Sequence, residues 1–216
     1  MNILVTGGAG FIGTSICRHL KEHYPQYAVT AFDNLRRRGS ELNLPDLRRR
    51  GIHFHHGDIR NADDLATIPG FDLMVEASAE PSVLAGLDSH PGYVIDNNLN
   101  GAVHCFHACL RHRARLIFLS TSRVYPIERI ENAAFVEQDT RFAFAPLQTE
   151  PGISADGISE LLNLDGFRSF YGATKLAAEL LIREYGAFYQ LPYAISRFGV
   201  VAGPGQLGKT DQGVVT

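Results

Sequence analysis

A cluster of glycines directly after a short apolar run is the feature that most constrains how this chain can fold. The run Ile3-Leu4-Val5 is followed by residues 6–13 (TGGAGFIG), and a helical pattern begins within that stretch. Glycine allows a sharp turn and leaves no Cβ in the way of a ligand. The helix that follows directs free N–H groups and its positive dipole end at the turn, which suits a pyrophosphate. The glycines at 7, 10 and 13 therefore predict a dinucleotide site.

An acidic residue at the end of the next apolar run supports this prediction. Residues 27–32 (YAVTAF) are typical of a strand, and Asp33 follows it, twenty positions after the last glycine of the turn. A carboxylate there can accept hydrogen bonds from the ribose hydroxyls of adenosine, and it repels a 2′-phosphate. The arginines at 36–38 can instead attract such a phosphate, or form a solvated loop. On balance Asp33 favours NAD over NADP.

Strands and helices alternate along the chain, which predicts an α/β fold. The expected architecture is a Rossmann-type, doubly wound parallel sheet with helices on both faces and with the strand carboxyl ends at one edge. Residues 126–170 are rich in Pro, Gly, Asn and Asp and predict a long irregular insert. The expected strands are 2–6, 27–32, 52–56, 71–76, 115–120 and 193–198, and the expected main helices are 11–23, about 92–112 and 169–188.

Composition excludes several classes of protein. The chain has 216 residues, of which 45% are hydrophobic, and a net charge of −3, so we expect one globular domain over residues 1–216 and no nucleic-acid partner. No apolar run approaches the roughly 20 residues that span a bilayer, and the N-terminal run is cut short by glycine. Three sparse cysteines point to reduced thiols. We therefore expect a cytoplasmic protein with no membrane association.

A group of histidines and cysteines on one expected helix is a possible metal site. Its members are scattered around several helix faces, and no second set of ligands is evident, so we predict no metal. The two cysteines are better explained as small buried side chains. The group comprises His104, Cys105, His107, Cys109 and His112.

Three residues form a candidate catalytic site. Tyr171 and Lys175 are four positions apart on one expected helix face, where an ammonium beside the phenol would lower the tyrosine pKa toward neutrality. Tyr171 could then act as a general base on a sugar hydroxyl. Thr121 comes directly after the expected strand 115–120 and can hydrogen-bond the reacting oxygen. Each piece alone is ordinary, but their joint occurrence after a glycine turn indicates function.

With these motifs in place, the chain resembles the extended short-chain dehydrogenases/reductases that act on nucleotide sugars. The matching segments are 6–13 (TGGAGFIG), 33–35 (DNL), 57–60 (GDIR), 120–125 (STSRVY) and 171–175 (YGATK). The resemblance implies that Thr121, Tyr171 and Lys175 are the catalytic trio. The cofactor residues that it implies or supports are Gly7, Gly10, Phe11, Ile12 and Gly13 at the pyrophosphate turn, Asp33 and Asn34, Asp58 and Ile59 at the adenine, Ala77 under the cofactor, and Lys175 at the nicotinamide ribose.

Which member of the family the chain resembles rests on finer motifs. The sugar-nucleotide 4,6-dehydratases carry an Asp-Glu pair after the catalytic threonine, whereas this chain has Ser122 and Arg123, which disfavours dehydration. Epimerases, reductases and decarboxylases remain. The long insert and the segments 32–39 (FDNLRRRG), 56–61 (HGDIRN) and 210–215 (TDQGVV) resemble the CDP-tyvelose (CDP-paratose) 2-epimerases. Pro126 and Phe170 depart from the usual Gly and Pro and could re-aim the site loop.

The resemblance also implies partners. Such enzymes oxidise a sugar hydroxyl transiently with a tightly held NAD, and they carry a C-terminal portion that contacts the nucleotide sugar. Because the chain stops soon after residues 202–206, we expect that substrate-binding domain to be absent. Alternatives are a nucleotide-sugar 4-epimerase, a reductase that exchanges its cofactor, or a dinucleotide-binding fragment without turnover. The family further implies a homodimer through helices about 92–112 and 169–188, although their apolar positions equally fit an internal core.

Overall fold

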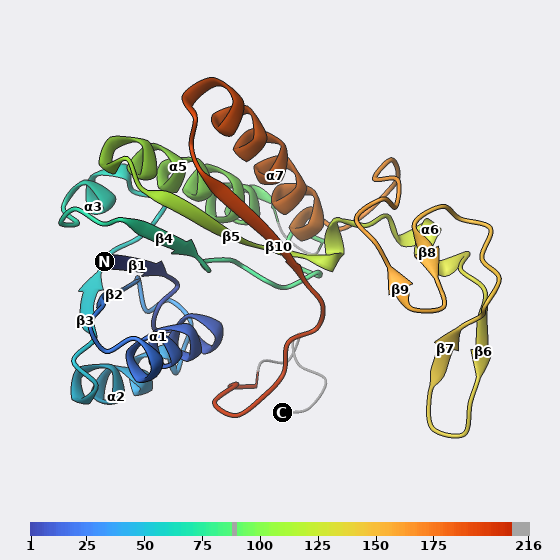
Figure 1. The fold of residues 1–216 in the computed structure, drawn as a ribbon, viewed down its shortest axis with the longest axis horizontal. Coiled ribbons are helices and arrows are strands. Elements are labelled where there is room, and N and C mark those ends of the chain that lie inside the picture. Colours follow the sequence, from blue (N-terminus) through green and yellow to red (C-terminus); the bar gives the residue numbers. More distant parts are fainter. Residues whose placement is uncertain (88–89, 209–216) are drawn as a thin grey trace.

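A six-stranded, fully parallel sheet forms the centre of the molecule (Figure 1). The structure is a computed structural model and describes residues 1–87 and 90–208. The strands lie in the order β10-β5-β4-β1-β2-β3, so the chain reverses direction across the sheet between β1 and β4. This is the predicted doubly wound topology, and ligands bind at such a reversal. The strands are β1 (Asn2–Thr6), β2 (Ala28–Asp33), β3 (His53–His56), β4 (Leu73–Glu76), β5 (Arg115–Thr121) and β10 (Tyr193–Phe198).

Helices cover both faces of the sheet, as predicted. α1 (Phe11–His23) and α2 (Leu44–Arg49) lie on one face, while α3 (Ala62–Ala66), α5 (Gly101–His112) and α7 (Phe170–Tyr189) lie on the other (Figure 1). The alternation of strand side chains divides the core accordingly. Ile3 and Val5 of β1 pack toward α1 and α2, whereas Leu4 packs toward α5 and α7. Both sets are buried, which is why the strands are apolar throughout.

The helix predicted at 92–112 is continuous but not uniform. It begins as α4 (Gly92–Ile95), widens into a π-helical turn, η2 (Asp96–Asn100), and continues as α5. Cys105 and Cys109 lie fully buried in the core, as the sequence predicted. In the described ranges, no three His, Cys, Asp or Glu side chains gather closely enough to hold a metal ion. No helix there is long and apolar enough to span a bilayer.

The segment predicted as one irregular insert contains more structure than expected. The short 3₁₀ turn η3 (Ser122–Val124) leads into α6 (Ile127–Glu131), and two antiparallel hairpins follow. The insert leaves the end of β5 and extends away from the sheet before the chain returns into α7 (Figure 1). Its strands are too short to give a periodic pattern in the sequence. They are β6 (Phe135–Glu137), β7 (Phe142–Phe144), β8 (Ile153–Ser154) and β9 (Gly157–Ile158).

The chain after β10 returns toward the first half of the molecule. Arg37 donates a hydrogen bond from Nη2 to the carbonyl oxygen of Leu207, at 3.0 Å. A Cβ built on Gly203 would lie 3.7 Å from Cζ of Phe11. This segment therefore passes the start of α1 and reaches the loop after β2. The motif at 210–215 lies outside the described residues.

Candidate active site

The glycine turn between β1 and α1 is so compact that a Cβ would not fit at Gly7 or at Gly13. Gly7 has a positive φ of 62°, and a Cβ there would lie 2.8 Å from the carbonyl oxygen of Ala77. A Cβ on Gly13 would lie only 2.0 Å from the carbonyl oxygen of Gly7. The N–H of Gly10 closes the turn by donating to that same oxygen, at 3.0 Å. Only glycine therefore allows the helix to start this close to the strand.

The beginning of α1 fits an anionic group. The N-cap residue of this helix, Gly10, has no side chain to accept from the first N–H groups, and the first turn contains no acidic residue. The first N–H groups of a helix lack partners within it, and they carry the positive end of the dipole. The main chain at Phe11 and Ile12 therefore suits a pyrophosphate, and its binding there stays a prediction. Ala77 lies against this turn, because its N–H donates to Oγ1 of Thr6 at 3.2 Å.

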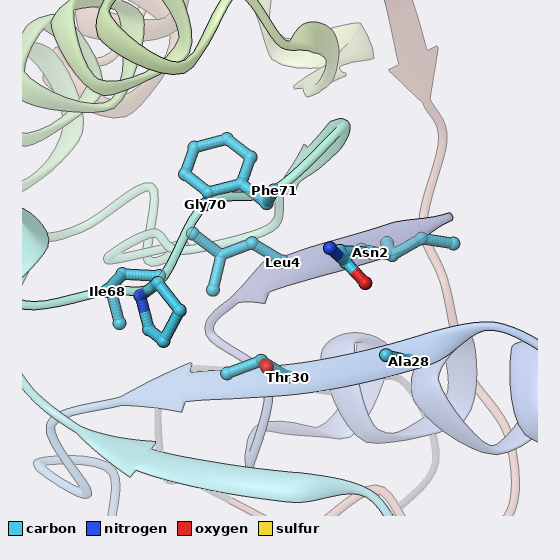
Figure 2. A pocket seen from close by; sticks show the side chains of 9 residues that line it. Asn2, Leu4, Ala28, Thr30, Ile68, Gly70 and Phe71 are labelled. Atoms are coloured by element: carbon cyan, nitrogen blue, oxygen red, sulfur yellow. The ribbon is translucent and has the colours of Figure 1, made fainter.

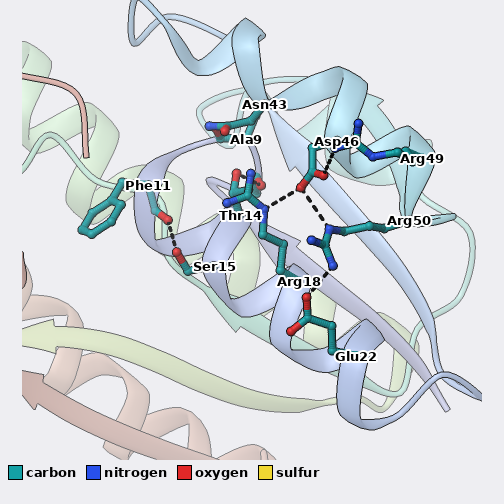
Figure 3. Close-up of polar contacts among 11 residues, drawn as sticks. Ala9, Phe11, Thr14, Ser15, Arg18, Glu22, Asn43, Asp46, Arg49 and Arg50 are labelled. Atoms are coloured by element: carbon teal, nitrogen blue, oxygen red, sulfur yellow. Dashed lines mark hydrogen bonds and ion pairs between the residues drawn. The ribbon is translucent and has the colours of Figure 1, made fainter. Parts of the chain in front are cut away.

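Two side chains hold the turn in place. Oδ2 of Asp33 accepts from the N–H of Ala9 at 3.1 Å, and Oδ1 accepts from the N–H of Leu35 at 2.8 Å. Nδ2 of Asn43 donates to the carbonyl oxygen of Ala9 at 2.9 Å (Figure 3). Burial raises the pKa of Asp33, and these N–H donors oppose that rise. Asp33 thus stabilises the turn by accepting hydrogen bonds from its main chain. Its contact with a ribose stays a prediction. No local pattern marked Asn43, since its contact crosses 34 positions.

The predicted adenine end lies at the next loops. Nδ2 of Asn34 donates to Oδ2 of Asp58 at 2.9 Å, and Arg60 pairs with Asp58 at 2.6 Å. The hydrogen bonds from Arg60 hold the pKa of Asp58 well below its usual range. Ile59 is 4% exposed and its side chain belongs to the core, so only its main chain is placed to meet a base. The guanidinium of Arg36 covers the ring of Tyr93 nearby, at 4.3 Å from the ring centre.

Two members of the predicted trio meet at the end of β5. Thr121 is the last residue of β5, and Tyr171 lies in the first turn of α7, where Oγ of Ser169 caps the helix by accepting from the N–H of Gly172. The side chain of Thr121 lies close enough to Tyr171 to lower the pKa of its phenol, although the two residues are fifty positions apart in the sequence. The prediction that Thr121 and Tyr171 share one site is therefore supported by their geometry.

The contacts of Lys175 differ from the expectation that its ammonium lies beside the phenol of Tyr171. Its Nζ lies 3.4 Å from Oε2 of Glu76 and 3.9 Å from the ring centre of Phe118, fully buried. The prediction of a lowered tyrosine pKa is wrong for this arrangement. Burial raises the pKa of Tyr171, the side chain of Thr121 partly offsets that rise, and the charge of Glu76 adds to it. The spacing placed Lys175 on the correct helix face, but the buried carboxylate opposite it was not anticipated.

A second buried ion pair supports the same region. Glu179 is fully buried, accepts from Oγ of Ser120 at 2.5 Å, and pairs with Arg197 of β10 at 2.6 Å. Glu179 holds the pKa of Arg197 above its usual range. This network ties α7 to β5 and β10 directly beside Thr121. Sequence reasoning missed Glu179, although it continues the four-residue spacing of Tyr171 and Lys175.

The π-helical turn contributes a further polar contact. Asn98 is 1% exposed and exchanges two hydrogen bonds with the main chain of Glu80, from N–H to Oδ1 at 2.8 Å and from Nδ2 to the carbonyl oxygen at 3.0 Å. Such turns are frequent at functional sites. Here the turn fixes the segment that follows β4, next to the glycine turn.

A cavity of about 200 Å³ lies elsewhere (Figure 2). It is lined by Asn2, Leu4 and Ala28, near the amino ends of β1 and β2, together with Ile68 and Phe71 before β4. The glycine turn and the catalytic residues lie at the carboxyl ends of the same strands, so this cavity is not part of the candidate site.

Comparison with known proteins agrees with this geometry. The model of the NAD dependent epimerase/dehydratase family matches residues 3–216. The chain belongs to this family. Membership confirms the predicted family, the Rossmann-like sheet and NAD as the family's cofactor.

The curated relatives carry several different activities. CDP-paratose 2-epimerase of Salmonella typhi is 29% identical over 221 residues, which cover 100% of this chain and 62% of that protein. A dTDP-glucose 4,6-dehydratase of Mycobacterium tuberculosis is 30% identical over 208 residues, covering 95% of this chain and 55% of that protein. The chain thus spans little more than half the length of these relatives.

Solved structures show the same fold. DesIV, a dTDP-glucose 4,6-dehydratase from Streptomyces venezuelae determined as a double mutant with NAD bound, superposes with a TM-score of 0.73 at 28% identity, covering 95% of this chain and 58% of that one. UDP-glucose 4-epimerase of Thermus thermophilus in complex with NAD gives 0.68 at 27% identity, covering 95% and 57%. Both likenesses support the fold and the cofactor, and they leave epimerisation and dehydration equally open.

Proposed function

We propose that this chain binds NAD and supplies the catalytic residues of a nucleotide-sugar epimerase. The observation that carries the proposal is that the first turn of α7, with Tyr171, packs against the end of β5, with Thr121, and that buried Lys175 lies one helical turn further along α7. This site lies at the same sheet edge as the glycine turn and Asp33, where the sheet reverses direction.

Each side chain has a distinct task in this proposal. The Tyr171 oxygen accepts the proton of a sugar hydroxyl, and Thr121 donates a hydrogen bond that stabilises the phenolate and then the sugar oxygen. Lys175 contacts the nicotinamide ribose, and when it does so its ammonium moves from Glu76 toward Tyr171. The start of α1 binds the pyrophosphate, and Asp33 the adenosine ribose. The chemistry that bound NAD would supply is reversible acceptance of a hydride from the sugar carbon, with return of that hydride to the opposite face.

Epimerisation is favoured over dehydration by the residues after Thr121. The dehydratases that the chain resembles carry an Asp-Glu pair at that point, and the chain has Ser122 and Arg123 in η3 instead. The 29% identity with CDP-paratose 2-epimerase supports a CDP-sugar as the first substrate to test and 2-epimerisation as the first reaction. A 4-epimerase and a cofactor-exchanging reductase are the alternatives. The non-enzymatic alternative is a chain that binds NAD but does not turn over a substrate.

Assembly and location form part of the proposal. Helices α4 and α5 both pack against α7, and apolar side chains on these helices stay exposed, including Ile95 on α4 and Leu180 on α7. We propose that this surface pairs two copies of the chain in a homodimer. The three cysteines are free and buried, which suits the reducing cytoplasm that we propose as its location.

The test has two parts. The purified protein is denatured and the released nucleotide is quantified by mass spectrometry, and we expect NAD in near-stoichiometric amount. The Tyr171→Phe variant should retain NAD and lose turnover of CDP-paratose by at least a hundredfold, since general base catalysis contributes about 10²–10⁴-fold. Tyr185→Phe, which removes a hydroxyl that contacts His107 away from the site, is the matched control.

Each outcome has a defined meaning. Full activity of Tyr171→Phe would overturn the catalytic assignment. Bound NAD without turnover of CDP-paratose or UDP-glucose would favour the non-enzymatic alternative. NADPH that exchanges freely would favour the reductase.

A further inference from the structure

Glu76 lies where a charged residue is unexpected. It ends β4 and pairs in register with Thr6 of β1, directly at the reversal of the sheet beneath the glycine turn. Its side chain is 1% exposed, and Oε1 accepts from the N–H of Ser78 at 3.0 Å. A carboxylate buried this deeply requires a partner of opposite charge. That partner is Lys175, 99 positions later in the chain.

The contact between these two groups is long for an ion pair. Nζ of Lys175 lies 3.4 Å from Oε2 of Glu76, whereas charge-assisted hydrogen bonds usually measure about 2.7–2.9 Å. The ammonium also faces the ring of Phe118. Among the described residues, two contacts therefore hold the Lys175 ammonium inside the protein. They are the long ionic contact with Glu76 and the contact with the ring of Phe118. A group held in this way can be drawn to a better set of acceptors.

In the part of the chain that the structure describes, few other charged groups act on Glu76. The titratable groups that face it are Lys175 and Tyr171 from α7 and Cys105 from α5. β1 contributes the neutral side chain of Thr6. Burial raises the pKa of Glu76, and the charge of Lys175 partly offsets this rise. The balance of the site thus depends on where the ammonium of Lys175 lies.

We propose that Glu76 is a positioning residue that competes with the cofactor ribose for the ammonium of Lys175. Glu76 draws the ammonium inward, and the ribose hydroxyls draw it toward the strand edge, where it can also act on Tyr171. This inference rests on the proposed function, which assigns Lys175 to the cofactor ribose. The affinity for NAD then includes the cost of separating Lys175 from Glu76.

A double-mutant cycle on NAD affinity tests this competition. Protein stripped of nucleotide is titrated with NAD by calorimetry at neutral pH, for wild type, Glu76→Gln, Lys175→Met and the double variant. We expect Glu76→Gln to bind NAD about fivefold or more tightly, a coupling within the usual range for linked sites. In the Lys175→Met background the same substitution should leave the affinity unchanged, because no ammonium remains to compete for.

Two further variants serve as controls. Glu76→Asp keeps the charge but retracts it by one methylene, so it should tighten binding to an intermediate degree even if Glu76→Gln fails to fold. Glu179→Gln removes the other fully buried carboxylate, which pairs with Arg197 instead, and should not tighten binding. Thermal unfolding confirms that each variant is folded.

The possible results separate cleanly. Unchanged or weaker NAD binding in both Glu76 variants would overturn the competition, as would equal tightening in the Lys175→Met background. Absence of NAD binding by the wild type would instead overturn the proposed function.

Discussion

At the scale of single residues, the candidate site depends on glycines, because a Cβ at their positions would not fit. Gly13 brings α1 against the turn because it has no side chain, and its hypothetical Cβ would also lie 2.8 Å from Cα of Gly8. The neighbours at that point are main-chain atoms, which cannot rotate aside as a flexible side chain can. A methyl group at position 13 would therefore displace the start of α1 from the turn, and with it the N–H groups that we propose for the pyrophosphate.

We predict that Gly13→Ala abolishes measurable NAD binding. The added methyl must push the start of α1 away from Gly7, which should also cost about 1–3 kcal/mol in the free energy of unfolding. Gly70→Ala is the matched control, because its Cβ would meet only Nδ1 of His112, at an ordinary 3.9 Å. Calorimetric NAD titration and urea unfolding measure the two effects. Normal NAD affinity in Gly13→Ala would show that the turn has more room than the structure indicates.

At the scale of elements, ion pairs centred on the carboxylate of Asp46 attach α2 to α1. Asp46 of α2 accepts from Arg18 of α1 at 2.6 Å and from Arg49 and Arg50 at 2.5 and 3.0 Å (Figure 3). Arg50 also pairs with Glu22 of α1. A short helix of six residues has little stability of its own, so its position depends on such contacts and on Leu47, which is buried beneath it.

We predict that this attachment is sensitive to acid. Partial burial opposes ionisation of Asp46, but the hydrogen bonds from Arg49, Arg18 and Arg50 lower its pKa to about 2. A carboxyl whose folded pKa lies below its unfolded value of about 3.9 contributes stability above pH 4 and loses it as the pH falls toward 2.

The measurement compares Asp46→Asn with wild type by urea unfolding. The variant should be about 1 kcal/mol less stable at pH 7, a modest value because the arginines are partly exposed. The difference should shrink as the pH approaches 2. Asp139→Asn, at the exposed tip of the β6–β7 hairpin, should match wild type at every pH. A difference for Asp46→Asn that does not change with pH would refute the electrostatic explanation.

At the scale of the whole molecule, the sheet divides the core into two layers, and the insert has a small core of its own. That third cluster contains Val124, Tyr125, Ile153 and Leu162, next to the start of α7. The outer face of α7 is the contrasting case, because Leu180 and Phe188 are 55% and 77% exposed. Exposed apolar side chains of this size on one helix are typical of an interface.

We predict that the protein is a dimer through this face. Light scattering coupled to gel filtration should give about twice the chain mass of 23.8 kDa. Leu180→Glu places a charge in the interface and should give a monomer of unchanged fold. Leu42→Glu, at a residue that is 70% exposed in the short helix η1 (Ser40–Asn43) on the opposite face of the sheet, is the control and should remain dimeric. A monomeric wild type would refute the proposed assembly.

The sequence alone determined the elements of the sheet, the glycine turn and the helix face that carries Tyr171 and Lys175, because periodicity and glycine spacing are local properties of the chain. It did not reveal the hairpins of the insert, whose strands have only two or three residues. Only the tertiary structure decided that Lys175 meets Glu76, 99 positions away, and that Glu179 meets Arg197. Such pairs form because right-handed crossovers bring distant strand ends to one buried edge, where each charge must find its partner.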